Sequence, residues 1–284
     1  MSVKRKICCL AAIFICILCA EAQNRCIFVQ ISDPQFGFRE EQGFACAQAL
    51  LEKAVMMTNA LEPDFVVVTG DMVNSPDDSL QFSAYMETIG KISGGIPVYH
   101  IPGNHDIGRD TETGLRRYAG RYGYDRFAFE QGGCAFIGIN SPVIKEMARP
   151  YERQQYRWLK RHLRDMKDAG VKIIFSHIPP VLKEYGEPEN YSNFPVRMQK
   201  KYIPLFARHG VTAVISGHLH DMAECTAKGI RMITSGPCGK PLGKGFSGIG
   251  IGIVDGQQME WRFIGLETQD NSKLTDNKTQ DIRK

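Results

Sequence analysis

The sequence lacks most of the features that mark a specialised class of protein. Its 284 residues contain no internal repeat and no low-complexity block, and the formal net charge is only +4. A charge this close to neutral does not favour nucleic acid or an anionic membrane as a partner. With 43% hydrophobic and 23% charged residues, the composition is that of a globular protein with one substantial core.

Cysteines are present but too scattered to form a framework. Beyond residue 22 there is no C-x-x-C pair, and an odd number of cysteines remains: Cys26, Cys46, Cys134, Cys225 and Cys238. This excludes a disulfide-rich scaffold and a cysteine-based zinc site. The set still allows one disulfide in an exported protein, and the sequence does not choose its pair.

Only one long apolar run interrupts this composition, at residues 7–18. It follows a basic start at residues 4–6 and precedes Ala20 and Ala22, which is the layout of a secretory signal. The run is short for a membrane span, although an uncleaved anchor is the alternative. We therefore predict a signal peptide at residues 1–22 and an exported protein, either periplasmic or secreted. Its removal takes away three basic residues and one acidic residue, which leaves a net charge of +2.

Residues 23–268 are predicted to form one domain, followed by a polar, flexible tail at residues 269–284. In the domain, β-branched runs alternate with helical patterns. Strands are predicted at residues 27–32, 65–69, 96–101, 126–130, 134–140, 171–176 and 211–216, followed by short antiparallel strands at 222–226, 230–234, 249–254 and 259–264. Helices are predicted at residues 44–61, 80–89, 112–119 and 152–168, with a further helix ending near residue 208.

Most of the predicted strands end in polar residues. Since the carboxyl ends of parallel strands share one edge of an α/β sheet, these residues are expected to converge there. Together they offer two carboxylates, an amide oxygen and three imidazoles, which suits a pair of divalent metal ions: Asp33, Asp71, Asn104, His177, His218 and His220. Considered singly, most of them would also suit a structural role, as a turn former, a loop acid or a buried histidine.

One of these strand ends, Gly103–Asp106, also carries a proton carrier. Gly103 permits a tight turn, Asn104 offers a neutral oxygen, and His105 exchanges protons near neutral pH. Asp106 is an acceptor that could orient His105. In isolation the same residues would make a polar turn that caps the next helix, so the hypothesis depends on the other strand ends.

The order of these motifs closely resembles that of the calcineurin-like metallophosphoesterase family. The motifs are D-x-Q at residues 33–35, G-D at 70–71, G-N-H-D at 103–106, a strand-terminal histidine at 177 and G-H-x-H at 217–220. The resemblance covers nearly all of the chain after residue 22, and it is strongest to the branch that includes a vertebrate Ser/Thr protein phosphatase. It implies an α/β (α+β) fold, a four-layer α/β/β/α sandwich with two mixed sheets.

By this resemblance the site binds two divalent metal ions. Gln35 stands where the family commonly has a histidine. A glutamine oxygen is a harder ligand than imidazole, which favours Mn²⁺ or Mg²⁺ over Zn²⁺ at the first position. Among Mn, Fe, Zn and Mg, the sequence leaves the identity open. The implied ligands are Asp33, Asp71 and His220, with Gln35 beside them, for the first ion, and Asp71, Asn104, His177 and His218 for the second.

The resemblance also implies a metal-dependent phosphoric ester hydrolase, in the first instance an exported phosphomonoesterase, that is, a phosphatase. In the implied mechanism, a hydroxide that bridges the two ions attacks phosphorus. His105 stabilises charge on the phosphoryl oxygens and protonates the leaving oxygen, with Asp106 as its orienting partner. Two alternatives stay open: a phosphodiesterase or nucleotide pyrophosphatase, and a metal-bound binding protein with weak catalysis.

The expected substrate is a phosphate ester held by residues around the metal pair. Arg109 would bind phosphate through two hydrogen bonds, although a solvated arginine fits the same position. Residues 181–195 form a polar, tyrosine-bearing segment that reads either as a lid over the substrate or as a solvated loop. Neither the physiological substrate nor the oligomeric state follows from the sequence. The predicted substrate contacts are Asn104, His105, Arg109, Tyr191 and Asn193.

Overall fold

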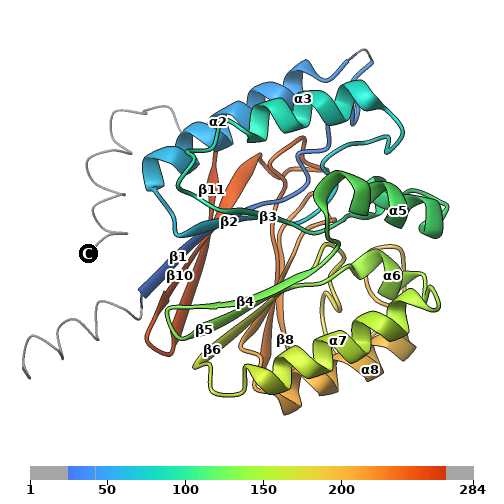
Figure 1. Ribbon diagram of the computed structural model, residues 1–284, viewed down its shortest axis with the longest axis vertical. Helices are drawn as coiled ribbons and strands as arrows, with labels where there is room; N and C mark the ends of the chain where they lie inside the picture. The colour runs from blue at the N-terminus through green and yellow to red at the C-terminus, as the bar shows by residue number, and fades with distance from the viewer. Residues whose placement is uncertain (1–24, 42, 267–284) are drawn as a thin grey trace, which may run out of the picture.

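The computed structural model describes residues 25–41 and 43–266. The predicted signal peptide, residues 1–22, and the predicted tail, residues 269–284, lie outside the described residues. Within the described ranges, no helix combines the length and the apolar character needed to cross a membrane. This part of the chain folds as two sheets with helices on both outer faces (Figure 1).

The first sheet has five strands: β1 Arg25–Ile31, β2 Phe65–Val68, β3 Val98–His100, β10 Gly248–Asp255 and β11 Gln258–Gly265. They stand in the order β11-β10-β1-β2-β3. β1, β2 and β3 run parallel, and β10 runs antiparallel to both of its neighbours. The sheet is therefore mixed.

The second sheet has six strands: β4 Phe127–Gln131, β5 Cys134–Gly138, β6 Val171–Phe175, β7 Ala213–Ser216, β8 Ala223–Ala227 and β9 Ile230–Thr234. They stand in the order β4-β5-β6-β7-β9-β8. The four central strands run parallel, while β4 and β8 run antiparallel at the two edges. This sheet is also mixed.

The two sheets face each other across a core rich in aromatic rings. Phe28 on β1 stacks on Phe65 of β2 with ring centroids 5.5 Å apart, and Phe175 of β6 packs edge-on against Phe28 at 5.4 Å. β10 passes so close to Phe28 that a Cβ at Gly252 would lie 2.0 Å from the ring, so this position needs glycine. The central strand β6 is buried along its whole length, as expected of a parallel strand covered on both faces.

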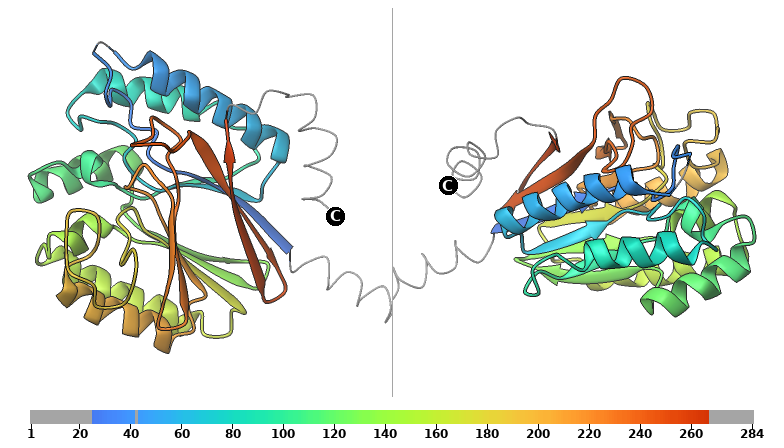
Figure 2. Two further views of the ribbon diagram at one scale, coloured as in Figure 1. Left: turned by 180° about the vertical axis from the view of Figure 1, so that it is seen from behind. Right: turned by 90° about the horizontal axis from the view of Figure 1, so that it is seen from above.

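Helices cover the outer face of each sheet. α2 and α3 lie over the first sheet, and α7 and α8 lie over the second (Figures 1 and 2). The layers therefore run helix, sheet, sheet, helix, which confirms the predicted α/β/β/α sandwich. The bounds are α2 Ala45–Leu61, α3 Ser79–Ile89, α4 Asn104–Ile107, α5 Thr111–Tyr122, α6 Ser141–Lys145, α7 Tyr151–Asp165 and α8 Val196–Arg208.

The predicted strands are all present, with ends displaced by no more than two residues. β8 with β9 and β10 with β11 form antiparallel pairs as predicted, whereas β9 also runs parallel to β7, which the sequence did not indicate. The short helices α4 and α6 were not predicted either, because a helix of about one turn has no apolar period to recognise.

The two sheets meet at the carboxyl ends of their parallel strands. Within the first sheet the Asp33 N–H donates to the Gly70 carbonyl at 3.2 Å, and within the second the Gly217 N–H donates to the His177 carbonyl at 3.0 Å. Between the sheets, the His218 N–H donates to Asp33 Oδ2 at 2.9 Å. Such bonds tie together the loops that follow β1, β2, β6 and β7, so the predicted ligands are brought to one edge. β1 runs from Arg25 toward this edge, which places Arg25 at the opposite edge of its sheet.

His100, at the end of β3, is buried among tyrosines and takes no part in this cluster. Its Nε2 bonds to the Tyr85 hydroxyl at 2.9 Å, its N–H donates to the Tyr124 hydroxyl at 3.1 Å, and its ring lies 4.7 Å from that of Tyr122. Burial lowers the pKa of His100 to about 3. The native protein therefore keeps this ring neutral at pH values where the unfolded chain protonates it.

We expect His100 to make the fold sensitive to acid. Its contribution to the free energy of unfolding is complete above a pH of about 6.5 and is lost progressively as the pH falls toward 3, which amounts to about 2 kcal/mol at pH 5. Urea unfolding of the wild type and His100→Gln at pH 7.5 and pH 5 measures this. Between the two pH values, the free energy of unfolding of the variant should fall by about 2 kcal/mol less than that of the wild type. Equal decreases would refute the assignment.

Candidate metal centre

The loops after β1, β2 and β7 have an unusual backbone conformation. Nine non-glycine residues of the described chain have positive φ, and a positive φ costs such residues about 1 to 3 kcal/mol. Surrounding hydrogen bonds hold these loops in place, and strain of this kind concentrates at functional sites. Five of the nine residues are predicted metal ligands: Asp33, Gln35, Asp71, His218 and His220.

The carboxylate of Asp106 organises the backbone next to Asp71. Its Oδ2 accepts from the N–H groups of Asp71 and Gly103, each at 2.8 Å, and its Oδ1 accepts from the Met72 N–H at 3.0 Å. Gly103 approaches so closely that a Cβ there would lie 2.0 Å from Asp71 Oδ1. Asp71 Oδ1 in turn accepts from the His105 N–H at 2.8 Å, so one network positions Asp71 and His105 together.

Each of the three predicted histidine ligands bonds to a main-chain carbonyl through one ring nitrogen. Donation of that ring N–H fixes the tautomer, as the second partner of a metal-binding histidine does. In the neutral rings the other nitrogens then carry lone pairs: His177 Nε2, His218 Nδ1 and His220 Nε2. The carbonyl acceptors are Thr69 for His177 Nδ1 at 2.9 Å, Lys240 for His220 Nδ1 at 2.6 Å, and Tyr191 for His218 Nε2 at 3.4 Å.

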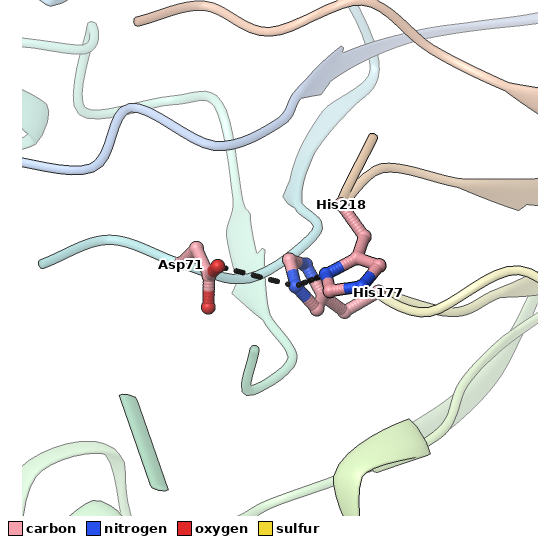
Figure 3. Close-up of side chains that lie close together, drawn as sticks. All are labelled: Asp71, His177 and His218. Carbon is pink, nitrogen blue, oxygen red and sulfur yellow. Dashed lines mark hydrogen bonds and ion pairs between the residues drawn. The ribbon is translucent and has the colours of Figure 1, made fainter. Parts of the chain in front are cut away.

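Three further ligand atoms converge on His177 Nε2. Asn104 Oδ1 lies 3.1 Å from it, His218 Nδ1 lies at 3.2 Å and Asp71 Oδ2 lies at 3.3 Å. One N–H would satisfy only one of these acceptors well, whereas a shared cation would satisfy them all. Ligand atoms of Asp71, His177 and His218 lie within 4.8 Å of one another (Figure 3), which suits one ion with ligands about 2 Å away. We call these four residues the second position.

Asp33, Gln35 and His220 form what we call the first position. Asp33 Oδ1 and Gln35 Oε1 have no hydrogen-bond partner among the described residues, although both side chains are buried. A buried oxygen without a partner is costly, so these atoms call for an ion or a donor. His220 Nε2 lies 3.6 Å from Asp33 Oδ1. The residues present therefore fit a metal ion at this position as well.

The buried carboxylates favour positive charge at the site. Burial alone would raise the pKa of Asp71, but the adjacent His177 holds it below its usual value. Burial would likewise lower the pKa of His177, yet the carboxylates of Asp71 and Asp33 raise it to about 9. Burial and the neighbouring His177 lower the pKa of His218 to about 4. Perturbations of this size among touching residues are typical of a functional site.

His105 lies beside the ligands and is held by the main chain. Its Nδ1 bonds to the Asn74 carbonyl at 2.8 Å, and its Nε2 has no hydrogen-bond partner in the part of the chain that the structure describes. The prediction that Asp106 orients His105 is wrong, because the Asp106 carboxylate binds main-chain N–H groups instead. Asp106 is thus a positioning residue, and Asn74 supplies the orienting acceptor.

Among the predicted substrate contacts other than Asn104 and His105, Tyr191 lies nearest to the predicted metal ligands. Its side chain is 67% exposed, and its hydroxyl lies 3.2 Å from Asn104 Nδ2. Arg109 is exposed and makes no hydrogen bond or ion pair with any other described residue. Tyr191 therefore lies next to a predicted ligand, whereas Arg109 contacts none of them, and both stay predicted substrate contacts.

Asn193 is wrongly predicted as a substrate contact. Its side chain is completely buried, its Oδ1 accepts from the Asn190 N–H at 2.8 Å, and its Nδ2 donates to Glu187 Oε1 at 2.7 Å and to the Pro188 carbonyl at 3.0 Å. With these bonds made, Asn193 holds the loop together and has no group to offer a ligand.

The chain matches the family model described as calcineurin-like phosphoesterase over residues 27–222. It belongs to the calcineurin-like phosphoesterase family. The protein is therefore a hydrolase of phosphoric esters, as the sequence predicted, and the paired positions described above are a candidate for the two-metal site of such a phosphoesterase.

Several known proteins are similar to this phosphoesterase. A Bos taurus protein named serine/threonine-protein phosphatase CPPED1 is 29% identical over 270 residues, which cover 88% of this chain and 86% of that protein. A protein of Arcobacter nitrofigilis named probable glycerophosphodiester phosphodiesterase GpdQ is 23% identical over 215 residues, covering 74% and 77%. A dimetal phosphatase of known structure from Danio rerio has the same fold, with a TM-score of 0.63 at 15% identity, covering 84% and 96%.

We expect Gln35 to set the metal preference of the phosphoesterase. Gln35→His would replace a neutral oxygen by imidazole, which should raise the ratio of Zn²⁺ to Mn²⁺ affinity at the first position about tenfold. Competition between the two ions, followed by elemental analysis, measures the ratio. Gln154→His, on the exposed surface of α7, controls for an added imidazole elsewhere. An unchanged ratio in Gln35→His would show that Gln35 is not a ligand.

Sequence reasoning missed the groups that orient the ligands. Most are main-chain carbonyls, of Thr69, Asn74, Tyr191 and Lys240, which any residue type would supply. Only Asn74 carried a signal in the sequence, as a polar residue three positions after Asp71. In the structure its side-chain oxygen also accepts from Gln35 Nε2 at 3.3 Å.

Proposed function

We propose that the protein is a phosphomonoesterase that uses two divalent metal ions and His105. The observation that supports this best is the convergence of Asp71 Oδ2, Asn104 Oδ1 and His218 Nδ1 on His177 Nε2. Next to these atoms stands a histidine whose Nε2 is bonded to no other described residue. Converging ligand atoms beside a proton carrier suit hydrolysis of a phosphate ester.

When bound, the two ions would supply the Lewis acidity that brings the pKa of water near neutrality and offsets charge on the phosphoryl oxygens. The first position offers a carboxylate, an amide oxygen and an imidazole, and the second offers a carboxylate, an amide oxygen and two imidazoles. The residues that would hold the ions are Asp33, Gln35 and His220 at the first position and Asp71, Asn104, His177 and His218 at the second.

His105 then acts on the ester itself. The Asn74 carbonyl takes the Nδ1–H, which leaves Nε2 for the substrate, and the bond from its N–H to Asp71 Oδ1 fixes where the residue stands. In the imidazolium form, Nε2–H donates to a phosphoryl oxygen and passes its proton to the leaving oxygen. The exposed Tyr191 contacts the substrate at the mouth of the site.

The substrate class that we propose comes from the relatives. The bovine relative is named as a serine/threonine-protein phosphatase, so peptides carrying phosphoserine or phosphothreonine are the first candidates. The Arcobacter relative is named for a phosphodiesterase, so a diester is the alternative. The loop that bears Tyr191 is the segment through which the protein would select its substrate.

Turnover of paired substrates tests the proposal. The chain from residue 23 onward would be supplied in turn with Mn²⁺, Fe²⁺, Zn²⁺ and Mg²⁺, and given an aryl phosphate, its bis-aryl diester and a phosphoserine peptide. We expect metal-dependent hydrolysis that is faster on the monoesters. Faster turnover of the diester would favour a phosphodiesterase, and bound metal without turnover of any ester would indicate a binding protein.

We also propose that the protein is exported and cleaved after Ala22. The support is the order of basic, apolar and small residues in residues 1–22. Expression of the full-length chain in a bacterial host, followed by fractionation and intact-mass measurement, checks this. The expected product lies outside the cytoplasm and begins at Gln23, whereas a cytoplasmic product that begins at Met1 would contradict the proposal.

A further inference from the structure

Tyr191 contacts two ligands of the second position at once. Its hydroxyl lies 3.2 Å from Asn104 Nδ2, and its main-chain carbonyl lies 3.4 Å from His218 Nε2. Its ring also packs against the His218 imidazole, with centroids 4.8 Å apart. One residue thus holds an amide ligand with its side chain and an imidazole ligand with its backbone.

The hydroxyl contact holds the Asn104 side chain in place beside the second position. An asparagine side chain has an oxygen that accepts and a nitrogen that donates. Nδ2 donates to the Tyr191 hydroxyl at 3.2 Å, while Oδ1 lies 3.1 Å from His177 Nε2. Rotation of the amide by 180° would present an NH₂ group to the ion.

The carbonyl contact decides which nitrogen of His218 serves as the ligand. With Nε2–H donated to Tyr191, the lone pair is on Nδ1, which lies 3.2 Å from His177 Nε2. The opposite tautomer would place a proton where the cation belongs. Partners of this kind typically change metal affinity by about 10-fold to 100-fold when they are removed.

The loop that carries Tyr191 is fixed by its own polar groups. The Glu187 carboxylate accepts from the N–H groups of Leu182 and Lys183, each at 2.8 Å, and from Asn193 Nδ2 at 2.7 Å. Lys145, at the end of α6, donates to the carbonyls of Asn190 and Asn193, the latter at 2.7 Å. Because the loop is already ordered, Tyr191 loses little conformational entropy when it holds the two ligands.

From these contacts we infer that Tyr191 is a positioning residue for the second metal ion, acting through Asn104 and His218. The inference rests on the proposed two-metal function and adds a specific determinant of metal affinity to it. Loss of the hydroxyl frees the Asn104 amide to rotate, while the carbonyl contact to His218 stays. Tyr191→Phe should therefore lower the metal affinity of the second position about tenfold and leave the affinity of the first position unchanged.

Tyr191→Phe and Tyr185→Phe make a matched pair of variants. Tyr185 belongs to the same loop, its ring faces Lys228 Nζ at 4.4 Å, and its hydroxyl makes no hydrogen bond with the rest of the described chain. Competition with a chelator measures the two Mn²⁺ affinities, and electron paramagnetic resonance separates coupled Mn pairs from single Mn ions. In Tyr191→Phe we expect single-ion signals at limiting Mn²⁺ and recovery of the pair signal at excess Mn²⁺. Tyr185→Phe should match the wild type throughout.

The outcomes separate this inference from the proposed function. A wild type that binds two Mn²⁺ ions but hydrolyses no phosphate ester would overturn the function, while the comparison of Mn²⁺ affinities would still decide the role of Tyr191. Two wild-type affinities in Tyr191→Phe would overturn the inference alone. Binding of fewer than two ions by the wild type would overturn both.

Discussion

Replacing His105 by alanine is expected to lower kcat on an aryl phosphate by about 10²-fold to 10⁴-fold, the range typical of a lost general acid. The substitution keeps the main-chain N–H that bonds to Asp71 Oδ1 and removes only the ring held by the Asn74 carbonyl. Metal content should therefore stay at the wild-type value. Steady-state kinetics at saturating metal, with elemental analysis of the same samples, measures both quantities.

His162→Ala is the matched control for this experiment. His162 lies on α7, with its ring 4.4 Å from that of Trp158, and makes no contact with any predicted ligand among the described residues. It should retain wild-type kcat. If His105→Ala also kept its kcat, His105 would have no role in catalysis, and if it lost bound metal, His105 would instead belong to the ligand set.

Removal of the Asp106 carboxylate is expected to cost about 3 to 9 kcal/mol of unfolding free energy. In Asp106→Ala the N–H groups of Asp71, Met72 and Gly103 would lose their acceptor in a buried region, at about 1 to 3 kcal/mol for each unpaired group. Domains of this kind are stable by about 5 to 15 kcal/mol, so the loss is large. Denaturant unfolding measures it, and metal content should fall as well because Asp71 is displaced.

Asp78→Ala provides the comparison for Asp106→Ala. Asp78 also accepts from two main-chain N–H groups, those of Leu80 and Gln81 at the start of α3, but it does so at the surface. Loss of such a helix cap costs about 1 kcal/mol. If Asp106→Ala kept wild-type stability and metal content but lost activity as His105→Ala does, Asp106 would orient His105 after all.

The fold was predictable because its central strands have a clear sequence pattern. β6 is five apolar or buried residues followed by Ser176 and His177, and β2 is four buried residues followed by Thr69, Gly70 and Asp71. An apolar run followed directly by polar residues predicts both the strand and the end at which the site residues lie. The six predicted strand-end ligands accordingly lie where the two sheets meet, with Gln35 next to them.

The roles of individual side chains were less predictable, because they depend on contacts between distant segments. Asp106 follows His105 directly, yet its acceptors face N–H groups more than thirty residues earlier. Asn193 has the residue type of a ligand contact, but the Glu187 carboxylate draws it into the loop. Sequence shows what a side chain can donate or accept, and only the fold shows which neighbour takes it.

The direction of β1 has a practical consequence for handling the protein. β1 enters at Arg25, about 20 Å of strand away from the edge that bears Asp33. β11, in contrast, ends beside Ser247, whose hydroxyl bonds to the Gly239 carbonyl one residue from Lys240, the partner of His220. An affinity tag or surface linker joined ahead of Arg25 would leave the metal positions facing the solution. One joined directly after Leu266 would begin next to the first metal position.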